Sequence, residues 1–512
     1  MKDTTGEPII GASIVEKGNT TNGTITDLDG NFSLKVPANA TVVISYIGMK
    51  TQEIAIKGKS KIDVTLSDDA KALDEVVVIG YGTAKRKDIT GSVASVNSET
   101  LAAIPVASAT EALQGKMAGV QITTTEGSPD AQMSIRVRGG GSITQSNEPL
   151  FIVDGFPVES ISDIPPTDIE SIDVLKDASS TAIYGARGAN GVIIVTTKSG
   201  KEGKVSVSYN AYYAWKKVAK TLDVLSASDY TKWQYELAQL TNKNDDYIKY
   251  FGNYQDLDMY DNVATNDWQD LTFGRTGHSF NHNLSINGGS DKFKYSFSYS
   301  HIDDKAIMQM SDYARDNLNL KLNHKPLKNV SLDFSARFSK TKINGGGSND
   351  ANSSLNTDKR LKYSLLYTPY PVPGISDALN ADEEDANSLL INPLISLRDN
   401  DTRKERINYN LAGSITWEII KDLKLKAEVG YDDYRNNADR YYGVTTYYVR
   451  NNVDDEDKSK PAISFTRGTR TAFRSTNTLS YDFKKFFKNN KNHLNLLAGQ
   501  EYIAVSYTHL RA

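Results

Sequence analysis

The sequence contains no cysteine among its 512 residues. This absence excludes disulfide frameworks, zinc–thiolate sites and cysteine nucleophiles. The chain also lacks an apolar stretch of the roughly eighteen residues that a transmembrane helix needs, and its mean hydropathy is −0.46. Strands of a membrane β-barrel would escape this test, because their alternating residues average out as hydrophilic.

Residues that commonly carry catalysis or bind metals are few and scattered. Of the six histidines, the two closest in sequence are His278 and His282, which would lie about 13 Å apart on a strand, too far to share a metal ion. The patterns HExxH, GxSxG and GxxxxGK[ST] do not occur. The acidic runs 382–385 and 454–457 are typical of solvated loops. We therefore predict that the chain is not an enzyme and binds no metal or cofactor.

The charge balance and the N-terminus exclude two further classes. The formal net charge is −4, so there is no basic footprint for nucleic acid. The first residues, MKDTTGEPIIGAS, lack a charged start followed by an apolar core, and so do not form a signal peptide. If the protein is exported, we expect that the first residues of its natural precursor are missing.

From residue 203 onward, apolar and polar residues alternate along successive stretches. In 293–299, for example, Phe, Tyr, Phe and Tyr alternate with Lys and Ser. Period-two alternation gives a strand one apolar and one polar face. Such strands form either half of a water-soluble sandwich or the wall of an outer-membrane barrel, with the apolar face toward lipid. The pattern recurs at 205–215, 280–286, 318–322, 330–338, 407–417, 423–431, 473–483 and, more weakly, 494–502.

The predicted connections separate these two readings. Long connections at 216–278, 301–313, 340–405 and 433–470 alternate with short ones at 288–292, 324–329, 418–422 and 484–492. Outer-membrane barrels have short periplasmic turns and long external loops, whereas a sandwich has no reason to place its long loops on one side. We therefore predict an antiparallel transmembrane barrel in 201–512. About nine strands cannot enclose a separate domain, which takes a barrel of the 22-stranded class, so we expect an incomplete barrel.

Residues 91–200 have a different, mixed pattern that predicts an α+β domain. Short apolar runs predict strands at 91–96, 120–124, 135–137, 150–153 and 192–197, and helices are expected at 109–116 and 168–176. Arg136 and Arg138 precede a glycine run that could form an anion nest. No nucleotide-binding context follows, so we favour their pairing with carboxylates of this domain or of a barrel wall. Asp154 is predicted to be a turn residue rather than a catalytic acid.

Four motifs of this region carry a family resemblance. ATEALQGKMAGVQI (109–122), SIRVRGGGSI (134–143), PLFIVDGFPV (149–158) and IESIDVLKDASSTAIYGARGANGVIIVTTK (169–198) stand in an order that resembles the plug of TonB-dependent outer-membrane transporters, and more narrowly the SusC/RagA group. The resemblance covers nearly the whole chain. It marks as plug signature Arg136, Arg138, Gly139, Asp154, Gly155, Lys176, Asp177, Tyr184, Gly185, Arg187, Gly188, Asn190 and Gly191.

The residues before the plug fit the same family. Residues 1–67 contain β-rich runs at 12–15, 23–26, 32–36, 41–47, 52–56 and 61–66, and are similar to a carboxypeptidase-regulatory-like β-sandwich. Asp27–Gly30 is predicted to be a β-turn, because the glutamate of a calcium loop is absent. In the linker 68–90, a β-branched run resembles the TonB box, which could pair with a partner's sheet edge; the alternative is a plain strand of the preceding sandwich. Its residues are Asp74, Glu75, Val76, Val77, Val78, Ile79, Gly80 and Tyr81.

The fold class predicted is mainly β: a sandwich, an α+β plug and a partial barrel in the outer membrane of a Gram-negative, Bacteroidetes-type bacterium. The resemblance implies TonB-driven import of an oligosaccharide or peptide, with TonB, a SusD-like lipoprotein and outer-membrane lipid as partners. The alternative is a non-transporting, β-rich, glycan-binding surface protein. That alternative would need neither the plug motifs nor one-sided loops.

Overall fold

The chain divides into two compact units, Met1–Ser92 and Val93–Ala512, which we describe separately. The computed structural model describes residues 1–2, 8–9, 11–17, 19–27, 29–46, 49, 52–66, 76–79, 82–85, 93–102, 106, 108–124, 133–140, 142, 146–345, 364–372, 392–444, 446, 449, 460–483 and 494–511. Within these residues no helix is both long and apolar enough to cross a bilayer.

The first unit is built on a four-stranded antiparallel sheet in the order β2-β1-β3-β4. Its strands are β1 (Ser13–Glu16), β2 (Asn19–Ile25), β3 (Thr41–Ser45) and β4 (Gln52–Ala55). The expected strands at 32–36 and 61–66 are wrong: apart from a single bridge at Thr65, these segments pair with no strand. Their apolar side chains, such as Phe32 and Leu66, instead pack on the sheet's apolar core. The alternating pattern thus predicted correctly that these side chains are buried, but it could not show whether a strand lies alongside for these segments to pair with.

A two-stranded antiparallel hairpin follows in the same unit. β5 (Val76–Ile79) pairs with β6 (Gly82–Lys85), with Val76 opposite Lys85 and Ile79 opposite Gly82. In the described part of the chain this sheet has only these two strands, so each has one edge that no strand covers.

The second unit begins with the plug, which we define as the described residues from 93 to 200. Its five-stranded sheet has the order β11-β10-β13-β12-β7, in which only β10 and β13 run parallel. The strands are β7 (Val93–Asn97), β10 (Leu150–Val153), β11 (Phe156–Val158), β12 (Ile169–Leu175) and β13 (Val192–Thr197). A second hairpin pairs β8 (Val120–Thr124) with β9 (Met133–Val137). The helical segments are α2 (Ser98–Ala102), α3 (Ala109–Ala112), η2 (Pro166–Asp168), α4 (Ala178–Thr181) and η3 (Ala182–Gly188).

The helix expected at 168–176 is wrong, because these residues form the strand β12. The spacing of Ile169, Ile172 and Leu175 fits a helical stripe, but all three side chains are fully buried in the sheet. β12 is hydrogen-bonded on both sides, by β13 and by β7. Successive residues from Ile172 to Leu175 are all buried, so this part of the strand is covered on both faces. Its sequence therefore lacks the alternation by which strands are usually identified.

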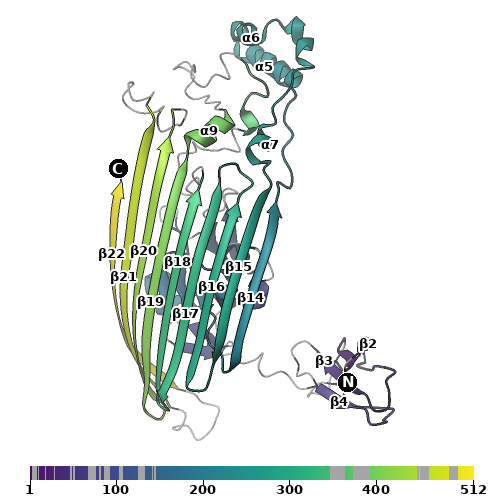
Figure 1. Ribbon diagram of the computed structural model, residues 1–512, viewed down its shortest axis with the longest axis vertical. Helices are drawn as coiled ribbons and strands as arrows, with labels where there is room; N and C mark the ends of the chain where they lie inside the picture. The colour runs from purple at the N-terminus through teal and green to yellow at the C-terminus, as the bar shows by residue number, and fades with distance from the viewer. Residues whose placement is uncertain are drawn as a thin grey trace. The chain divides into compact units, whose positions relative to one another are not determined.

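Residues 203–511 form one nine-stranded antiparallel sheet, the wall, with its strands in chain order (Figure 1). The predicted strand count and the mainly β class are confirmed. The strands are β14 (Gly203–Lys216), β15 (Gly277–Gly289), β16 (Phe293–Lys305), β17 (Asp312–Leu327), β18 (Val330–Asn344), β19 (Thr402–Ile420), β20 (Leu423–Tyr442), β21 (Ala462–Asp482) and β22 (Asn495–Arg511).

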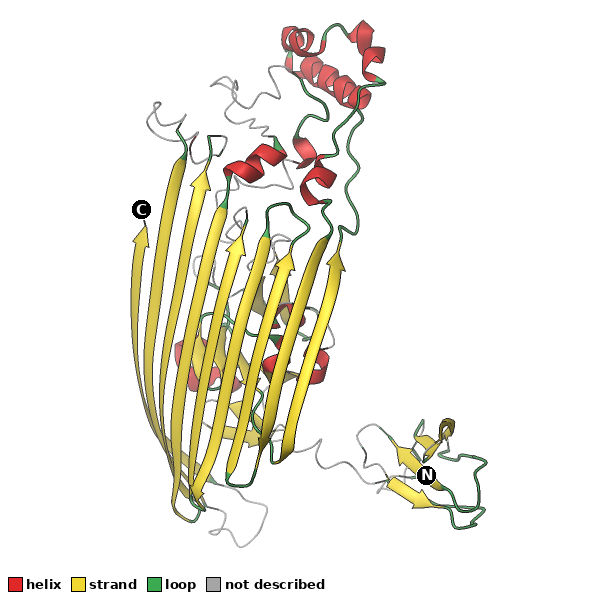
Figure 2. Cartoon of the chain, viewed as in Figure 1, coloured by secondary structure: helices red, strands yellow, loops and turns green. Residues whose placement is uncertain are grey.

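The connections at one end of the wall are longer than those at the other, except that 306–311 is shorter than 483–494. At one end the strands are joined through 217–276, 306–311, 345–401 and 443–461, and at the other through 290–292, 328–329, 421–422 and 483–494. The predicted long loop at 301–313 is wrong, because β16 and β17 continue their pairing as far as Lys305 and Asp312. The following helices of the wall's connections gather at the first of these two ends (Figure 2). They are α5 (Ala227–Thr241), α6 (Asn244–Phe251), η4 (Tyr254–Tyr260), α7 (Trp268–Phe273) and α9 (Pro393–Asp399).

The two faces of the wall have opposite chemistry. The face turned toward the plug buries polar side chains, among them Asn283, Ser300 and Asp432. The outward face exposes large apolar ones; Val207 and Tyr209, for example, remain 63% and 61% exposed. A water-soluble sandwich would bury the apolar face against a second sheet. The polarity is therefore inverted relative to that of a water-soluble protein, and it is the polarity of a barrel wall in lipid.

Candidate functional site

The plug folds around an apolar core of its own. The core comprises buried residues between Val96 and Val195, with partly buried neighbours that also belong to the plug. The polar contacts described next join this domain to the wall. A domain with a self-contained core and a polar boundary can separate from its surroundings without exposing its apolar interior, because water replaces the lost hydrogen bonds.

The first of these contacts lies at the turn between β10 and β11. Asp154 occupies a left-handed conformation there, with φ of +51°, and Gly155 follows with φ of +84°. The Asp154 carboxylate accepts hydrogen bonds from the backbone N–H of Thr197 (2.9 Å) and from its hydroxyl (2.8 Å). It also pairs with the Nζ of Lys321 on β17 at 2.8 Å, and Lys321 donates to the Thr197 carbonyl at 2.9 Å.

The electrostatics of this turn keep Asp154 charged. Burial alone would raise the pKa of the Asp154 carboxyl, but the nearby charges of Lys321 and Arg337 and the hydrogen bonds of Asp154 outweigh it. The pKa of Asp154 therefore lies below its ordinary value. The residue is a turn residue and also the plug's half of an ion pair with the wall.

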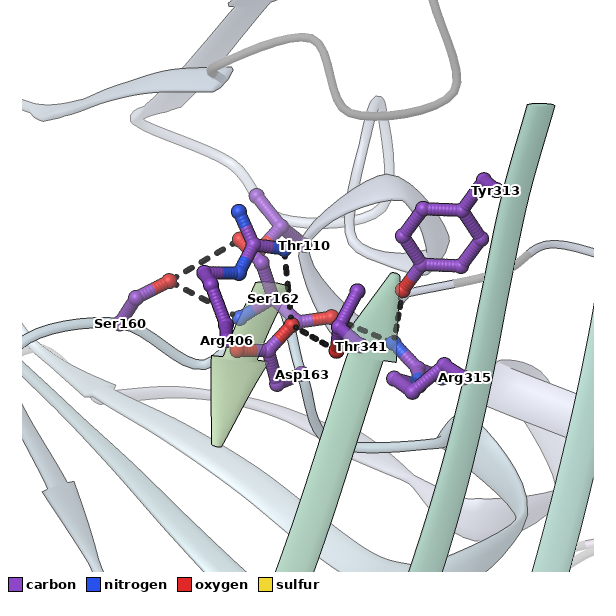
Figure 3. Close-up of polar contacts among 8 residues, drawn as sticks. All are labelled: Thr110, Ser160, Ser162, Asp163, Tyr313, Arg315, Thr341 and Arg406. Carbon is purple, nitrogen blue, oxygen red and sulfur yellow. Dashed lines mark hydrogen bonds and ion pairs between the residues drawn. The ribbon is translucent and has the colours of Figure 1, made fainter. Parts of the chain in front are cut away.

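A second set of contacts holds the plug segment 159–163. Asp163 pairs with Arg406 of β19 at 3.0 Å, and the Thr341 hydroxyl of β18 donates to it at 3.3 Å (Figure 3). The carbonyl of Ser162 accepts from Nη1 of Arg315 at 2.8 Å, and Arg315 is almost fully buried. Three neighbouring strands of the wall thus contact this one segment.

A third set lies on β20 and β21. Arg470 of β21 bridges Glu159 of the plug at 3.2 Å and Asp432 of the wall at 2.9 Å. Arg474, also on β21, donates to the Gly155 carbonyl and pairs with Glu501 of β22 at 2.7 Å. Across all three sets, the plug supplies carboxylates and carbonyls, and the wall supplies cations and the Thr341 hydroxyl.

A cavity of about 410 Å³ lies beside the segment 159–163. Asn408 of β19 lines it, and its side-chain oxygen is buried without a hydrogen-bond partner. Burial raises the pKa of Glu148, another lining residue. The lining is thus rich in acceptors, which suits a ligand or waters that donate hydrogen bonds. The lining residues are Thr110, Met133, Ile135, Glu148, Phe151, Val158, Glu159, Ser160, Ser162, Asp163, Asn408, Asp432, Tyr434 and Arg470.

One apolar contact between plug and wall depends on a glycine. The Phe156 ring lies so close to Gly430 of β20 that a Cβ at position 430 would overlap it. We expect Gly430→Ala to lower the free energy of unfolding by about 1–3 kcal/mol, as overpacking does. Gly413→Ala on β19 is the matched control, because its nearest neighbour would be the Asp333 carbonyl oxygen at 3.8 Å. Guanidinium unfolding in detergent measures both, and equal midpoints would contradict the predicted contact.

A buried carboxylate predicts a pH effect on stability. Burial raises the pKa of Asp168 above its ordinary value, and hydrogen bonds from Ser298 and Asn283 of the wall offset this only in part. Between the ordinary and the raised pKa the folded state binds more protons than the unfolded state, so stability falls as pH rises through this window. Asp168→Asn removes that decline. The free energy of unfolding of Asp168→Asn, relative to that of the parent protein, should therefore be higher at pH 7 than at pH 4. The gain is about 1.4 kcal/mol for each unit by which folding raises the pKa of Asp168.

The measurement is guanidinium unfolding at the two pH values, with Asp223→Asn as the control. Asp223 is an exposed aspartate in the connection 217–276. For Asp223→Asn, the difference in free energy of unfolding from the parent should be the same at pH 4 and at pH 7. If it is also the same for Asp168→Asn, Asp168 does not titrate in the manner described.

The remaining plug-signature residues stay within the plug. Arg138 pairs with Asp177, while Arg136 is exposed on β9. Lys176 donates to the Ala118 carbonyl, and Asn190 donates to the Ser146 carbonyl at 3.0 Å. These contacts hold plug loops together, and of the two signature arginines Arg138 pairs with a carboxylate of the plug itself.

The signature glycines and their neighbours define the turn before β13. Gly185 breaks η3 with φ of +58°, and Gly191 enters β13 with φ of +91°. Gly188 is buried so closely against Thr181 that a Cβ would lie 2.9 Å from its carbonyl oxygen. Tyr184 and Arg187 lie in η3, and Gly139 follows β9 with φ of +102°.

The predicted TonB-box residues are only partly described. Val76–Ile79 form β5, and Asp74, Glu75, Gly80 and Tyr81 lie outside the described residues. β5 is extended, as the hypothesis requires, and it already pairs with β6 along one edge.

Sequence reasoning missed the wall's half of the site. Lys321 stands on the polar face of a predicted alternating segment, which marks it as plug-facing but names no partner. The other wall residues of the site lie beyond the predicted segments, which were drawn too short: Arg315, Arg406, Asp432 and Arg470. A charged residue on the polar face of such a strand is the signal that would have identified them.

Metal ligands do not cluster in the described part of the chain. No group of three or more His, Asp or Glu side chains there could hold a metal ion.

Two family models match the chain. Residues 85–192 match the TonB-dependent Receptor Plug Domain, and residues 1–78 match the CarboxypepD_reg-like domain.

Relatives and solved structures agree with these matches. The chain is 42% identical over 325 residues to the TonB-dependent receptor SusC of Bacteroides thetaiotaomicron, covering 62% of this chain and 30% of SusC. It is 33% identical to the TonB-dependent receptor P3 of Formosa agariphila, covering 97% of this chain and 46% of P3. The RagAB peptide importer in the "open-open" state is similar in structure, with a TM-score of 0.64 and 26% identity, covering 85% of this chain and 50% of that one. The chain thus spans at most about half the length of these proteins, whose names describe receptors and an importer.

Proposed function

This chain belongs to the SusC/RagA type of TonB-dependent receptors, and from that membership we propose that it works in nutrient import across the bacterial outer membrane. The observation that carries the proposal is the inverted wall, apolar outward and polar toward a plug that it holds through ion pairs. Such a wall is stable with its outward face in hydrocarbon, and its polar face lines a path that the plug closes.

TonB is the proposed source of energy. β5 has one edge that no described strand covers, and an incoming strand can extend a sheet at such an edge through main-chain hydrogen bonds. A pull transmitted from this hairpin would act on the plug, which is joined to the wall by contacts that water can replace. The plug then shifts, and the ligand passes along the polar face of the wall.

The proposed cargo is an oligosaccharide or a peptide, and the proposed partner over the long connections is a SusD-like lipoprotein. The similarity to the RagAB peptide importer supports the peptide class, and the oligosaccharide class rests on the resemblance to the SusC/RagA group. The acceptor-rich cavity beside the segment 159–163 suits either class, because sugar hydroxyls and peptide amides both donate hydrogen bonds.

Uptake in the native bacterium tests the proposal. We expect that deletion of the receptor's gene abolishes uptake of one class of labelled oligosaccharide or peptide, and that loss of TonB does the same. Undiminished uptake of every candidate in both strains would contradict import. Recovery of the receptor without detergent would favour the non-transporting alternative.

A further inference from the structure

The outward face of the wall changes chemistry between two adjacent rows of registered residues. In one row, which we call the apolar row, β-ladder partners follow one another across five strands: Leu284, Tyr299, Leu318, Phe338 and Tyr409. Ladder partners share a face of a sheet, and Tyr299 and Tyr409 are 39% and 41% exposed, so this row faces outward.

The next row toward the long connections is polar. It contains His282, His301, Asp316, Lys340 and, after Ile407, Arg435. The two rows are separated by two residues along each strand, which is about 7 Å. Across that distance the outward surface passes from aromatic and aliphatic side chains to ionisable ones, with Ile407 as the exception.

Several ionisable side chains of this region form ion pairs with one another. His301 lies 2.8 Å from Asp316, Lys340 lies 3.1 Å from Glu405, and Arg435 lies 2.8 Å from Asp433. Arg467 of β21 pairs with Asp439 of β20. We call these four pairs, on β16 to β21, the charged belt. Pairing lowers the cost of a charge beside a low-dielectric medium, where an unpaired ion is costly.

Tyrosines join the two rows. The Tyr299 ring stands in the apolar row, while its hydroxyl donates to Asp316 of the charged belt at 2.8 Å. Tyr431 likewise donates to Asp433 at 3.4 Å. An aromatic ring in hydrocarbon with its hydroxyl in a wet layer is the arrangement favoured at a membrane–water interface.

The level of the boundary differs between β15 and β20. On β15 the outward residue one row beyond His282, toward the long connections, is still aromatic: it is Phe280. On β20 the apolar row is already acidic at Asp433, and the aromatic residue, Tyr431, lies one row lower. A flat boundary cuts ladder rows obliquely when strands are tilted to the membrane normal, as they are in barrels.

We infer that the charged belt lies in the head-group layer of a lipid bilayer, and that hydrocarbon ends between the apolar row and the belt. The belt is thus an interaction surface for polar lipid head groups, at the end of the wall that carries the long connections. This inference rests on the proposed membrane location of the wall.

Spin labels on β18 test the position of the boundary. Because the chain has no cysteine, a single introduced cysteine takes the only label in these 512 residues, and any cysteine elsewhere in the receptor is first replaced by serine. The labelled receptor is studied in lipid nanodiscs. Phe338→Cys labels the apolar row, Lys340→Cys the belt, and Ser339→Cys the opposite face. We expect a water-soluble nickel chelate to relax the label at 340 about fivefold more strongly than the label at 338, because hydrocarbon excludes water. Oxygen, which concentrates in hydrocarbon, should show the reverse order.

Leu318→Cys and Asp316→Cys repeat the comparison on β17, should a β18 variant fail to fold. Equal protection of labels in the belt and in the apolar row from the nickel chelate would overturn the inference but leave the proposed function standing. Exposure of the labels at 338 and 318 to the chelate, as at 339, would overturn both, because the outward face would then lie in water.

Discussion

Removal of Val76–Ile79 is expected to reduce ligand uptake to the level of a TonB-deficient strain. The four residues form β5, whose uncovered edge is the proposed docking edge for TonB. Without that edge no main-chain ladder can form, so no pull reaches the plug. Uptake of a labelled ligand by cells that produce the full receptor measures the effect, and ligand binding to isolated membranes should remain unchanged.

A pair of point variants makes this test sharper. Val78→Pro removes a backbone N–H from the strand, whereas Val78→Thr keeps both the N–H and a high β-propensity. We expect the proline variant to behave like the deletion and the threonine variant like the parent. If the deletion transports at the parental rate, the energising role assigned to β5 is wrong.

Lys321→Met is expected to loosen the plug. The substitution leaves the Asp154 carboxylate without the cation that lies 2.8 Å away, in a site that burial already makes unfavourable for charge. Breaking a buried pair from one side costs about 3–5 kcal/mol, and the charge of Arg337 offsets part of it. A plug that detaches more often should admit hydrophilic solutes, so cells that produce the variant should become sensitive to an antibiotic too large for general porins.

Two further variants distinguish the loss of the Asp154–Lys321 ion pair from a general effect of substitution on the fold. Lys325→Met changes the same residue type on the same strand, at an exposed position, and should leave sensitivity unchanged. Asp154→Asn combined with Lys321→Met removes both charges and should recover part of the barrier, because no uncompensated ion remains. If Lys321→Met and Lys325→Met cells are equally resistant, the pair does not hold the plug.

Much of the architecture could be predicted because it follows from local patterns. Period-two alternation from residue 203 predicted nine strands and which face of each is apolar, since a strand's side chains must alternate. The density of glycine in 185–191 predicted the turn before β13, since those positions require left-handed backbone or a missing Cβ. The order of four motifs was enough to indicate the family.

What depends on neighbours could not be predicted in this way. Residues 169–175 form a strand because β7 and β13 lie on either side, and residues 32–36 do not because no strand pairs with them. The length of β16 and β17 is set by their mutual ladder rather than by either sequence.

The sequence by itself determined the classes of residue available to the site, and the tertiary structure decided their partners. Asp154 is recognisable as a turn residue and Lys321 as a residue of the polar face, but 167 positions separate them. Their pairing arises only when the plug sits against β17, because Coulomb attraction and hydrogen bonding act over a few ångströms of space and not along the chain.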